Sequence, residues 1–381
     1  MNRFPFDAPP LLPEAEALRL EVRDFLRTEL ANSTALERAE SWNGWSAEFS
    51  AKMGERGWIG MTWPKRYGGH ERSALERYVV LEEMLAGGAP VSAHWFADRQ
   101  SGPLLLRSGT ERQRQEILPR IARGNCFFCI GLSEPDVGSD LASVRTKAVA
   151  VDGGYLVNGT KLWTTNGHRS HYMVLLCRTS ETSERHQGTS QFLVDMKTQG
   201  IKITPVHAMT GEHHFNEIVF TDVFLPSDCV IGTVGDGWQQ VTSELANERS
   251  GPERFLSSFA LFVELVHALE SSSSEYATAA LGRLTAHIVT LRRMSRSVAA
   301  MLQAGADPML QAVIVKDLGA LFEQEIPEIA RALVGYEPTP LTVSNFSSVL
   351  AYTTLHAPSF SLRGGTREIL RGIIARGLGL R

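Results

Sequence analysis

The feature that most constrains the fold is a double change of hydrophobic period along the 381-residue chain. Between residues 13 and about 125, apolar side chains recur at helical spacing. From about 126 to 233, short β-branched and aromatic runs alternate with turn signals, which predicts strands. From about 236 the helical period returns. This order predicts two helical regions with an antiparallel β domain or barrel between them. The clearest helical stripes are Leu18, Val22, Phe25, Leu26 and Leu30, and later Leu281, Leu284, Ile288, Leu291 and Val298.

Composition and charge exclude several classes of protein. Hydrophobic residues make up 43% and charged residues 21% of the chain, which is ordinary for a globular protein. The net charge is -4 and no long basic run occurs, so we expect neither nucleic acid nor an anionic membrane surface as a partner. No apolar run approaches the roughly 18 residues of a membrane span. Four cysteines are too few for a disulfide scaffold, and the N-terminus lacks a signal-peptide pattern, so we expect a cytoplasmic protein.

Three polar or glycine-rich patterns do not predict a metal or redox site. Cys126 and Cys129 have Cys-x-x-Cys spacing, but their flanks predict a strand, where positions three apart face opposite sides. His213 and His214 are adjacent and have no third ligand at metal spacing. The glycines between 232 and 237 lack the order of a phosphate-binding loop and favour a turn into a helix at Trp238. We therefore predict no metal.

Two segments of the β region carry candidate binding groups. Residues 131–143, GLSEPDVGSDLAS, offer hydroxyls and exposed backbone N–H groups that could hold a phosphate or a ring carbonyl, or could form only a capped turn. Residues 158–167, NGTKLWTTNG, place Trp163 and Thr165 on one face of a predicted strand. An aromatic plane beside a hydroxyl suits a flat heterocycle, although a tryptophan in the core would give the same pattern.

The chain ends with a second glycine signal. Gly364, Gly365 and Thr366 stand directly before an amphipathic run that predicts a last helix. The glycines either mark only the helix start or belong to a site.

Taken together, these segments resemble the acyl-CoA dehydrogenase family almost from end to end. The branch that it resembles most carries its catalytic glutamate on a helix of the C-terminal domain, as isovaleryl-CoA and bacterial steroid side-chain dehydrogenases do. Six segments match in the same order: GWIGMTWPKRYGG, SGTERQRQEILPRIARG, LSEPDVGSD, NGTKLWTTN, NEIVFTDVFLP and GGTREILRGIIARGLG.

The resemblance implies an α+β multidomain fold with FAD bound between subunits. It divides the chain into an N-terminal α-helical domain (1–125), a middle antiparallel β domain (126–233) and a C-terminal four-helix bundle (234–381). It also implies the roles of the candidate residues: Leu132 and Ser133 contact the flavin pyrimidine, and Trp163 and Thr165 lie beside flavin N5. Further matching cofactor-binding positions are Gly138 and Ser139 near the pyrophosphate, and Thr366 and Glu368 near the phosphates and ribose. The family often has glutamine where this chain has Glu368.

The implied reaction is the α,β-dehydrogenation of an acyl-CoA thioester to the trans-2-enoyl-CoA. A carboxylate takes the α proton and flavin N5 takes the β hydride. Many family members carry this carboxylate as Glu-Gly-Thr in the terminal loop, but the matching residue here is Gly364, which cannot accept a proton. In the helix-borne branch the base belongs to a Glu-Arg pair, which falls on Glu248 and Arg249. We predict Glu248 as the base, with Glu244 as the alternative.

A local argument supports Glu248. Pro252 follows it by four residues and cannot donate the helical hydrogen bond to its carbonyl, so the helix should kink or open there. The alternative is that Glu248 is an exposed helix residue paired with a neighbour. The resemblance also assigns Arg249, Gly364 and Gly365 to the substrate site, and the glycine at 364 could make room for a branched or bulky acyl chain.

Two family motifs are absent. The Arg-x-x-Phe-Gly that reaches the FAD of a neighbouring subunit does not occur between 250 and 335, and ALVGYEP (332–338) stands near the place of the usual Gly-Gly-x-Gly. The chain could therefore be a non-catalytic or half-site subunit of a heteromeric dehydrogenase, or a flavin oxidase or monooxygenase on the same fold. The expected partners are an acyl-CoA substrate, electron-transferring flavoprotein as the electron acceptor, and either identical subunits or a related subunit in a tetramer.

Overall fold

A computed structural model describes residues 5–182, 184–248, 251–272, 274–335 and 344–380, and of residues 244–248 it describes the backbone alone. The chain divides into two compact units. The first unit contains Met1–Trp45, Arg72–Ser92 and Ala246–Arg381, and the second contains Ser46–Glu71 and Ala93–Leu245.

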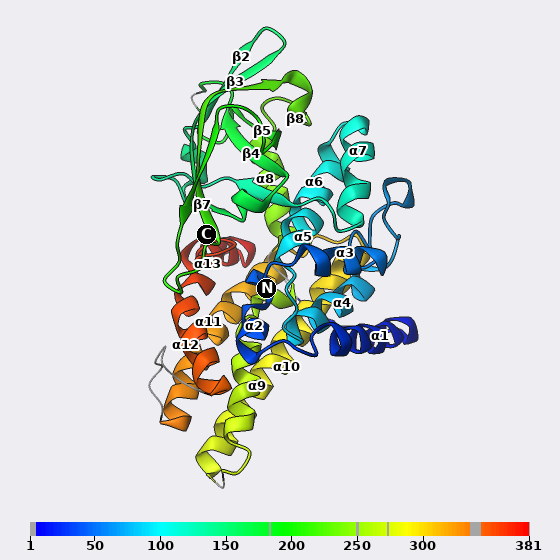
Figure 1. Ribbon diagram of the computed structural model, residues 1–381, viewed down its shortest axis with the longest axis vertical. Coiled ribbons are helices and arrows are strands. Elements are labelled where there is room, and N and C mark those ends of the chain that lie inside the picture. The colour runs from blue at the N-terminus through cyan, green and yellow to red at the C-terminus, as the bar shows by residue number, and fades with distance from the viewer. Residues whose placement is uncertain (1–4, 183, 249–250, 273, 336–343, 381) are drawn as a thin grey trace. The chain divides into compact units, whose positions relative to one another are not determined.

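The first unit is helical (Figure 1). Its longest helices, α10 and α11, pack against each other, α12 packs on α11 and α9, and α13 packs on α11, which gives the expected C-terminal bundle. In α1 the predicted stripe is buried as a continuous face. The helices are α1 (Pro13–Glu29), α2 (Ala35–Glu40), α4 (Ala74–Ala86), α9 (Phe259–Ala268), α10 (Glu275–Gln303), α11 (Met309–Val334), α12 (Asn345–Phe360) and α13 (Arg367–Gly377).

Local sequence signals fix where these helices begin. The Ser274 hydroxyl accepts a hydrogen bond from the Ala277 amide at the start of α10. At the start of α11 the Asp307 carboxylate accepts a hydrogen bond from the Met309 amide. Such caps satisfy amide groups that have no partner within the helix.

The second unit combines a sheet with helices (Figure 1). The strand order is β6-β7-β3-β2-β4-β5-β8, with β1 paired to β4. The strands are β1 (Phe128–Gly131), β2 (Lys147–Val151), β3 (Gly154–Thr165), β4 (Tyr172–Arg178), β5 (Thr189–Asp195), β6 (Ile201–Val206), β7 (Phe215–Pro226) and β8 (Val230–Ile231). The helices are α3 (Ala47–Glu55), α5 (Ser92–Phe96), α6 (Gly102–Ser108), α7 (Glu111–Ala122) and α8 (Gly237–Glu248), of which α5 begins and α8 ends at the edge of the unit.

Strand pairing is mostly, but not wholly, antiparallel. The pairs β2–β3, β3–β7, β4–β5, β5–β8 and β6–β7 are antiparallel as predicted. The pairs β1–β4 and β2–β4 are parallel. Both parallel pairs join strands separated by a long stretch of chain, which parallel pairing requires and a tight hairpin does not permit. The sequence did not predict β2, β6 and β8 as separate strands: β2 and β8 are short, and Pro205 lies within β6.

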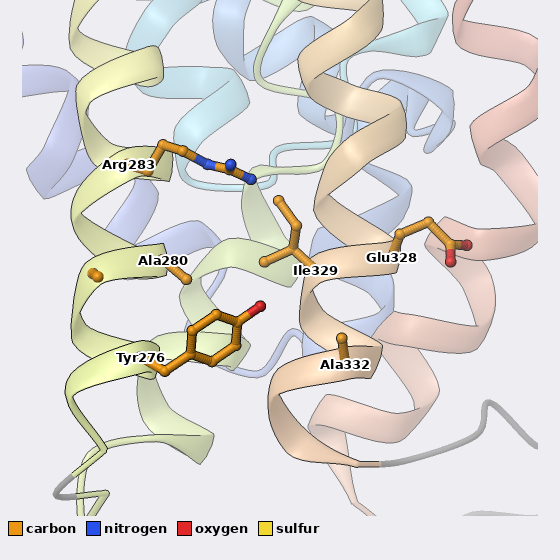
Figure 2. Close-up of a pocket in the computed structure, with 7 residues that line it drawn as sticks. Tyr276, Ala280, Arg283, Glu328, Ile329 and Ala332 are labelled. Atoms are coloured by element: carbon orange, nitrogen blue, oxygen red, sulfur yellow. The ribbon is translucent and has the colours of Figure 1, made fainter.

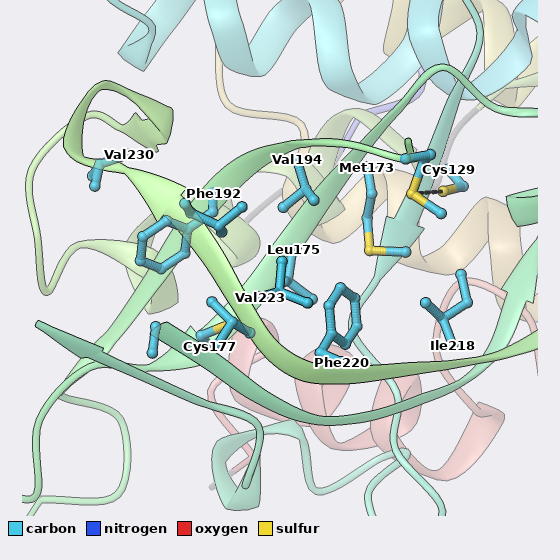
Figure 3. Close-up of a cluster of buried hydrophobic side chains, with 14 residues drawn as sticks. Cys129, Met173, Leu175, Cys177, Phe192, Val194, Ile218, Phe220, Val223 and Val230 are labelled. Atoms are coloured by element: carbon cyan, nitrogen blue, oxygen red, sulfur yellow. Dashed lines mark hydrogen bonds between the residues drawn. The ribbon is translucent and has the colours of Figure 1, made fainter. Parts of the chain in front are cut away.

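The core of the sheet explains the apolar strand runs (Figure 3). Alternate residues of β4, β5 and β7 point inward and are buried together, as a strand period of two requires. The inward residues include Met173, Leu175, Cys177, Phe192, Val194, Ile218, Phe220 and Val223.

The division into three domains stays a prediction. The two compact units do not follow it, because the N-terminal helices are divided between them. Helices α1, α2 and α4 lie in the first unit, whereas α3, α6 and α7 lie in the second. Within the part of the chain that the structure describes, none of the helices has the length and hydropathy to cross a bilayer.

Candidate functional site

The loop after β1 is held by a buried ion pair. The Lys161 ammonium lies 2.8 Å from a Glu134 carboxylate oxygen, and the two side chains are 0% and 6% exposed. Lys161 also donates to the Leu132 carbonyl at 3.1 Å. The Glu134 carboxylate accepts from the amides of Arg145 and Thr146 at 2.8 and 2.9 Å. The pair therefore closes residues 132–146 into a fixed loop.

Electrostatics keep Glu134 ionised in this dry position. Burial would raise the pKa of its carboxyl, but the Lys161 ammonium and the hydrogen bonds outweigh burial and hold the pKa below its usual value. Neither residue was predicted as part of the site. Both lie inside the two quoted motifs, but Lys161 stands between Thr160 and Leu162, and the sequence did not mark it as buried.

A backbone hydrogen bond joins the two predicted binding segments. The Leu162 amide donates to the Ser133 carbonyl at 2.9 Å, so Ser133 lies directly beside the strand segment that carries Trp163. Leu132 packs against a cluster of Val144, Leu176 and Val241. Two motifs that are separate in the sequence thus form one structural unit.

Trp163 stands out from the sheet. Its φ is 63°, in the left-handed region that bulky residues avoid, and it lies in an irregularity of the β3–β7 ladder between Lys161 and Thr164. The indole is 56% exposed and meets the edge of Phe215 at a centroid distance of 5.8 Å. Thr165 is half-buried, while Thr164 between them is buried. A strained backbone that exposes an aromatic plane is typical of a binding site.

The glycine-serine part of the first segment is open. Gly138 and Ser139 are exposed, and a Cβ at Gly138 would meet nothing within 4 Å. The next residue, Asp140, accepts from the Ser143 hydroxyl and from Arg185. The exposed backbone at Gly138 and Ser139 is consequently available to a ligand, as the prediction requires.

In the first unit, the Gly364–Thr366 loop makes a left-handed turn into α13. Gly364 and Gly365 have φ values of 66° and 93°, which favour glycine. Thr366 is the N-cap residue, and the backbone amide of Glu368, followed by the Thr366 hydroxyl, lowers the pKa of the exposed Glu368 carboxyl. The double glycine thus has a conformational role whether or not the loop binds a ligand.

The place of a side chain at Gly364 is covered by a guanidinium. A Cβ built on Gly364 would lie 3.0 Å from both terminal nitrogens of Arg254 and 3.1 Å from its Cζ. Arg254 is 3% exposed, and its Nε lies 3.2 Å from a Glu253 carboxylate oxygen. Nothing in the sequence indicated this contact, because the two positions are 110 apart in the chain.

The predicted base lies at a helix end. α8 ends at Glu248, and the next helical turn, Pro252–Arg254, begins with Pro252. The backbone at Gly251 is extended, with a ψ of 167°, so the expected interruption before Pro252 is present. The side chains of Glu244 and Glu248, and Arg249 as a whole, lie outside the described residues.

The remaining sequence candidates have structural roles. Cys126 and Cys129 are free and buried, and burial raises the pKa of their thiols to about 11 and about 12, which disfavours a reactive thiolate. His213 Nε2 lies 2.8 Å from Asn216 Oδ1, whereas His214 Nε2 lies 2.9 Å from Glu212 Oε2. The glycines from 232 lead into α8 at Gly237.

A groove between α10 and α11 lies apart from these residues (Figure 2). Its volume is about 370 Å³, and Tyr276 and Ile329 point into it, with Arg283 and Glu328 at its sides. None of the predicted site residues is among those that line it.

Comparison with known proteins agrees with the resemblance. Models of the N-terminal and middle domains of acyl-CoA dehydrogenases match residues 13–125 and 129–223. The acyl-CoA dehydrogenases FadE29 and IpdE1 of Mycobacterium tuberculosis are 31% and 33% identical to the chain. These matches cover 96% and 97% of the chain, and 96% and 98% of the relatives. The acyl-CoA dehydrogenase FadE34 of the same organism is 33% identical over 86% of the chain, which spans only 45% of that relative's length.

Solved structures show the same fold. The Tcur3481-Tcur3483 steroid ACAD has a TM-score of 0.87 and 25% identity, and the match covers 98% of this chain and 99% of the other. The ChsE4-ChsE5 complex from Mycobacterium tuberculosis has a TM-score of 0.84 and 29% identity, with 98% and 99% covered.

Proposed function

Because the chain belongs to the acyl-CoA dehydrogenase family of oxidoreductases, we propose that it converts an acyl-CoA thioester to the trans-2-enoyl-CoA with Glu248 as the base. The single observation that carries the proposal is the joined unit of the Ser133 loop and the Trp163 strand. A left-handed, exposed tryptophan costs free energy in the protein alone, and a flat ligand stacked on it would offset that cost.

The described residues fit FAD. The open backbone at Gly138 and Ser139 offers N–H groups to a pyrophosphate, and Trp163 and Thr165 offer an aromatic plane beside a hydroxyl. In the first unit, the ionised Glu368 suits a ribose hydroxyl better than a phosphate, and Thr366 supplies a hydroxyl next to it. When bound, FAD would supply the acceptor for the β hydride. We assign Leu132 and Ser133 to the flavin pyrimidine.

The chain itself must supply the proton acceptor. The α proton of a thioester is weakly acidic, so the base must lie close to it in a dry site that raises its pKa toward neutrality. Gly364 offers no acid, and the guanidinium beside it leaves little space for one. The end of α8 at Glu248, just before the turn that carries Arg254, supports Glu248 as the base. Arg249, Gly364 and Gly365 would line the substrate site, and Glu244 is the alternative base.

The test is anaerobic reduction of the bound flavin by an acyl-CoA. The Glu248→Gln variant should bind FAD normally but bleach about 10²–10⁴-fold more slowly, because it retains the shape of the side chain without the base. The Glu244→Gln variant is the matched control on the same helix and should bleach at the wild-type rate. Bleaching of Glu248→Gln at that rate would show that the base lies elsewhere. A screen of straight, branched and bulky acyl-CoA substrates in the same assay identifies the acyl group.

A second candidate is a half-site subunit of a heteromeric dehydrogenase. It is favoured by the absence of Arg-x-x-Phe-Gly between 250 and 335 and by the similarity to the ChsE4-ChsE5 complex. Expression alone would then give a colourless protein that gains flavin only with a related subunit. A yellow homotetramer would exclude this candidate. In either assembly we propose that electrons pass to electron-transferring flavoprotein, within lipid breakdown.

A further inference from the structure

Two arginines connect the Gly364 loop with the turn that follows Glu248. Arg254, in the turn Pro252–Arg254, covers Gly364 with its guanidinium. In the opposite direction, Arg363 Nη2 donates to the Glu253 carbonyl at 3.0 Å and to the Ser257 hydroxyl at 2.6 Å. Each segment therefore extends an arginine onto the backbone of the other, and we call this pair of contacts the arginine clasp.

The clasp is buried and charge-matched. Glu253 and Arg254 are 1% and 3% exposed, and Arg363 Nη2 lies 3.0 Å from a carboxylate oxygen of Glu323, which is also buried. Ionic groups in a dry interior hold their geometry because any displacement leaves a charge uncompensated. The buried charges of the clasp therefore oppose displacement of either segment.

The turn is also fixed against α11. A Cβ at Gly319 of α11 would lie 2.0 Å from the Arg254 carbonyl oxygen, so only glycine permits this close approach. The Ser258 hydroxyl donates to the Glu323 carbonyl, also on α11. Backbone contact with α11 and the clasp together determine where the turn lies.

We propose that Arg254 is a positioning residue for the reaction: it occupies the space at Gly364 and fixes the turn Pro252–Arg254 against the Gly364–Thr366 loop. This inference rests on the proposed function for its catalytic consequence. Arg254 follows Glu248 by only six positions, so fixing Arg254 restricts where the end of α8 can lie. It also explains why position 364 holds glycine: a larger residue would displace the guanidinium.

A double-mutant cycle between positions 254 and 364 tests the contact without relying on activity. Gly364→Ala should lower the melting temperature, because the new methyl group meets the guanidinium and because φ is 66°. Gly305→Ala is the matched control, since Gly305 has a φ of 71° and open space around its Cβ position. In the Arg254→Ala background the loss at Gly364 should shrink to that at Gly305, whereas the Gly305 loss should not change. An equal loss at Gly364 in both backgrounds overturns the contact.

The positioning role needs a kinetic readout. Per bound flavin, Arg254→Ala should lower kcat about tenfold or more and leave KM for the acyl-CoA nearly unchanged, because a base displaced by about 1 Å loses rate and not binding. Arg254→Lys should recover part of kcat, since it retains the charge without the planar fork. An unchanged kcat in Arg254→Ala overturns the positioning role. A wild-type protein that fails to oxidise any acyl-CoA would contradict the proposed function, and the melting cycle would still decide on the contact.

Discussion

The Ser133 loop and the Gly364 loop are both fastened by a buried ion pair, but the two ion pairs differ in how completely their polar atoms are satisfied. Lys161 donates to a carboxylate and to a carbonyl, and Glu134 accepts two backbone amides as well. Arg363 donates to three oxygen atoms, all through Nη2. In the described part of the chain, no acceptor is found for its buried Nε and Nη1 atoms.

At Arg363, aromatic rings partly replace the missing hydrogen bonds. The Arg363 guanidinium lies 4.3 Å from the centroid of Trp42 and 4.8 Å from that of Phe360, so it has cation–π contacts where hydrogen bonds are lacking. Burial lowers the pKa of Arg363 to about 10, against the opposing effect of Glu323. Because the polar atoms of its ion pair are better satisfied, we infer that displacing the Ser133 loop costs more free energy than displacing the Gly364 loop.

The largest effect is expected for Lys161→Met. It leaves Glu134 as an uncompensated buried carboxylate and should lower the free energy of unfolding by about 3–5 kcal/mol. Chemical denaturation measures this loss. The Glu134→Gln/Lys161→Met double variant, which removes both charges, should recover part of it. A double variant as unstable as the single one would mean that shape, and not charge, fastens this loop.

The pH dependence has a defined sign for the same pair. Because the folded-state pKa of Glu134 is lowered, its contribution is fully present above the unfolded value of about 4.3 and is lost as the pH falls through the folded pKa. Wild type should therefore lose more stability on acidification than the double variant.

Arg363→Met tests the ion pair that holds the Gly364 loop. It leaves Glu323 with the Ser257 amide as a remaining donor, so the expected loss is about 2–3 kcal/mol, smaller than at Lys161. Arg331→Met is the control, because Arg331 pairs with Glu328 at the surface and should change stability by less than about 1 kcal/mol. If Arg363→Met lowers the free energy of unfolding as much as Lys161→Met does, the two ion pairs hold their loops equally firmly and the proposed difference is wrong.

The smallest effect on stability is expected for Trp163→Gly. Glycine relieves the left-handed backbone and sacrifices only an exposed side chain, so the free energy of unfolding should change by no more than about 1 kcal/mol. FAD binding should nevertheless weaken about tenfold, measured by titration of the apoprotein. The control is Tyr276→Ala, which removes an exposed aromatic ring from the α10–α11 groove and should leave flavin affinity unchanged. Equal flavin affinity in both variants would remove Trp163 from the cofactor site.

Local signals in the sequence predicted much of the fold. The stripe of Leu18, Val22 and Phe25 predicted a helix whose buried face the structure confirms, since a helical period of 3.6 can be read from the chain alone. The strands β4, β5 and β7 coincide with three of the short β-branched and aromatic runs that predicted strands. The segments β2 and β6 were not predicted, because β2 is short and largely exposed and Pro205 weakens the alternating pattern of β6.

What the sequence determined by itself is therefore the order of helices and strands, the family, and the absence of an acid at Gly364. What only the tertiary structure decided is how the motifs are supported: Glu134 with Lys161, Ser133 beside Leu162, and Arg254 over Gly364. The physical reason is the distance along the sequence over which each interaction acts. Helical period, caps and turn signals act over a few residues, whereas a buried charge requires a partner that the folded chain supplies from any distance along the sequence.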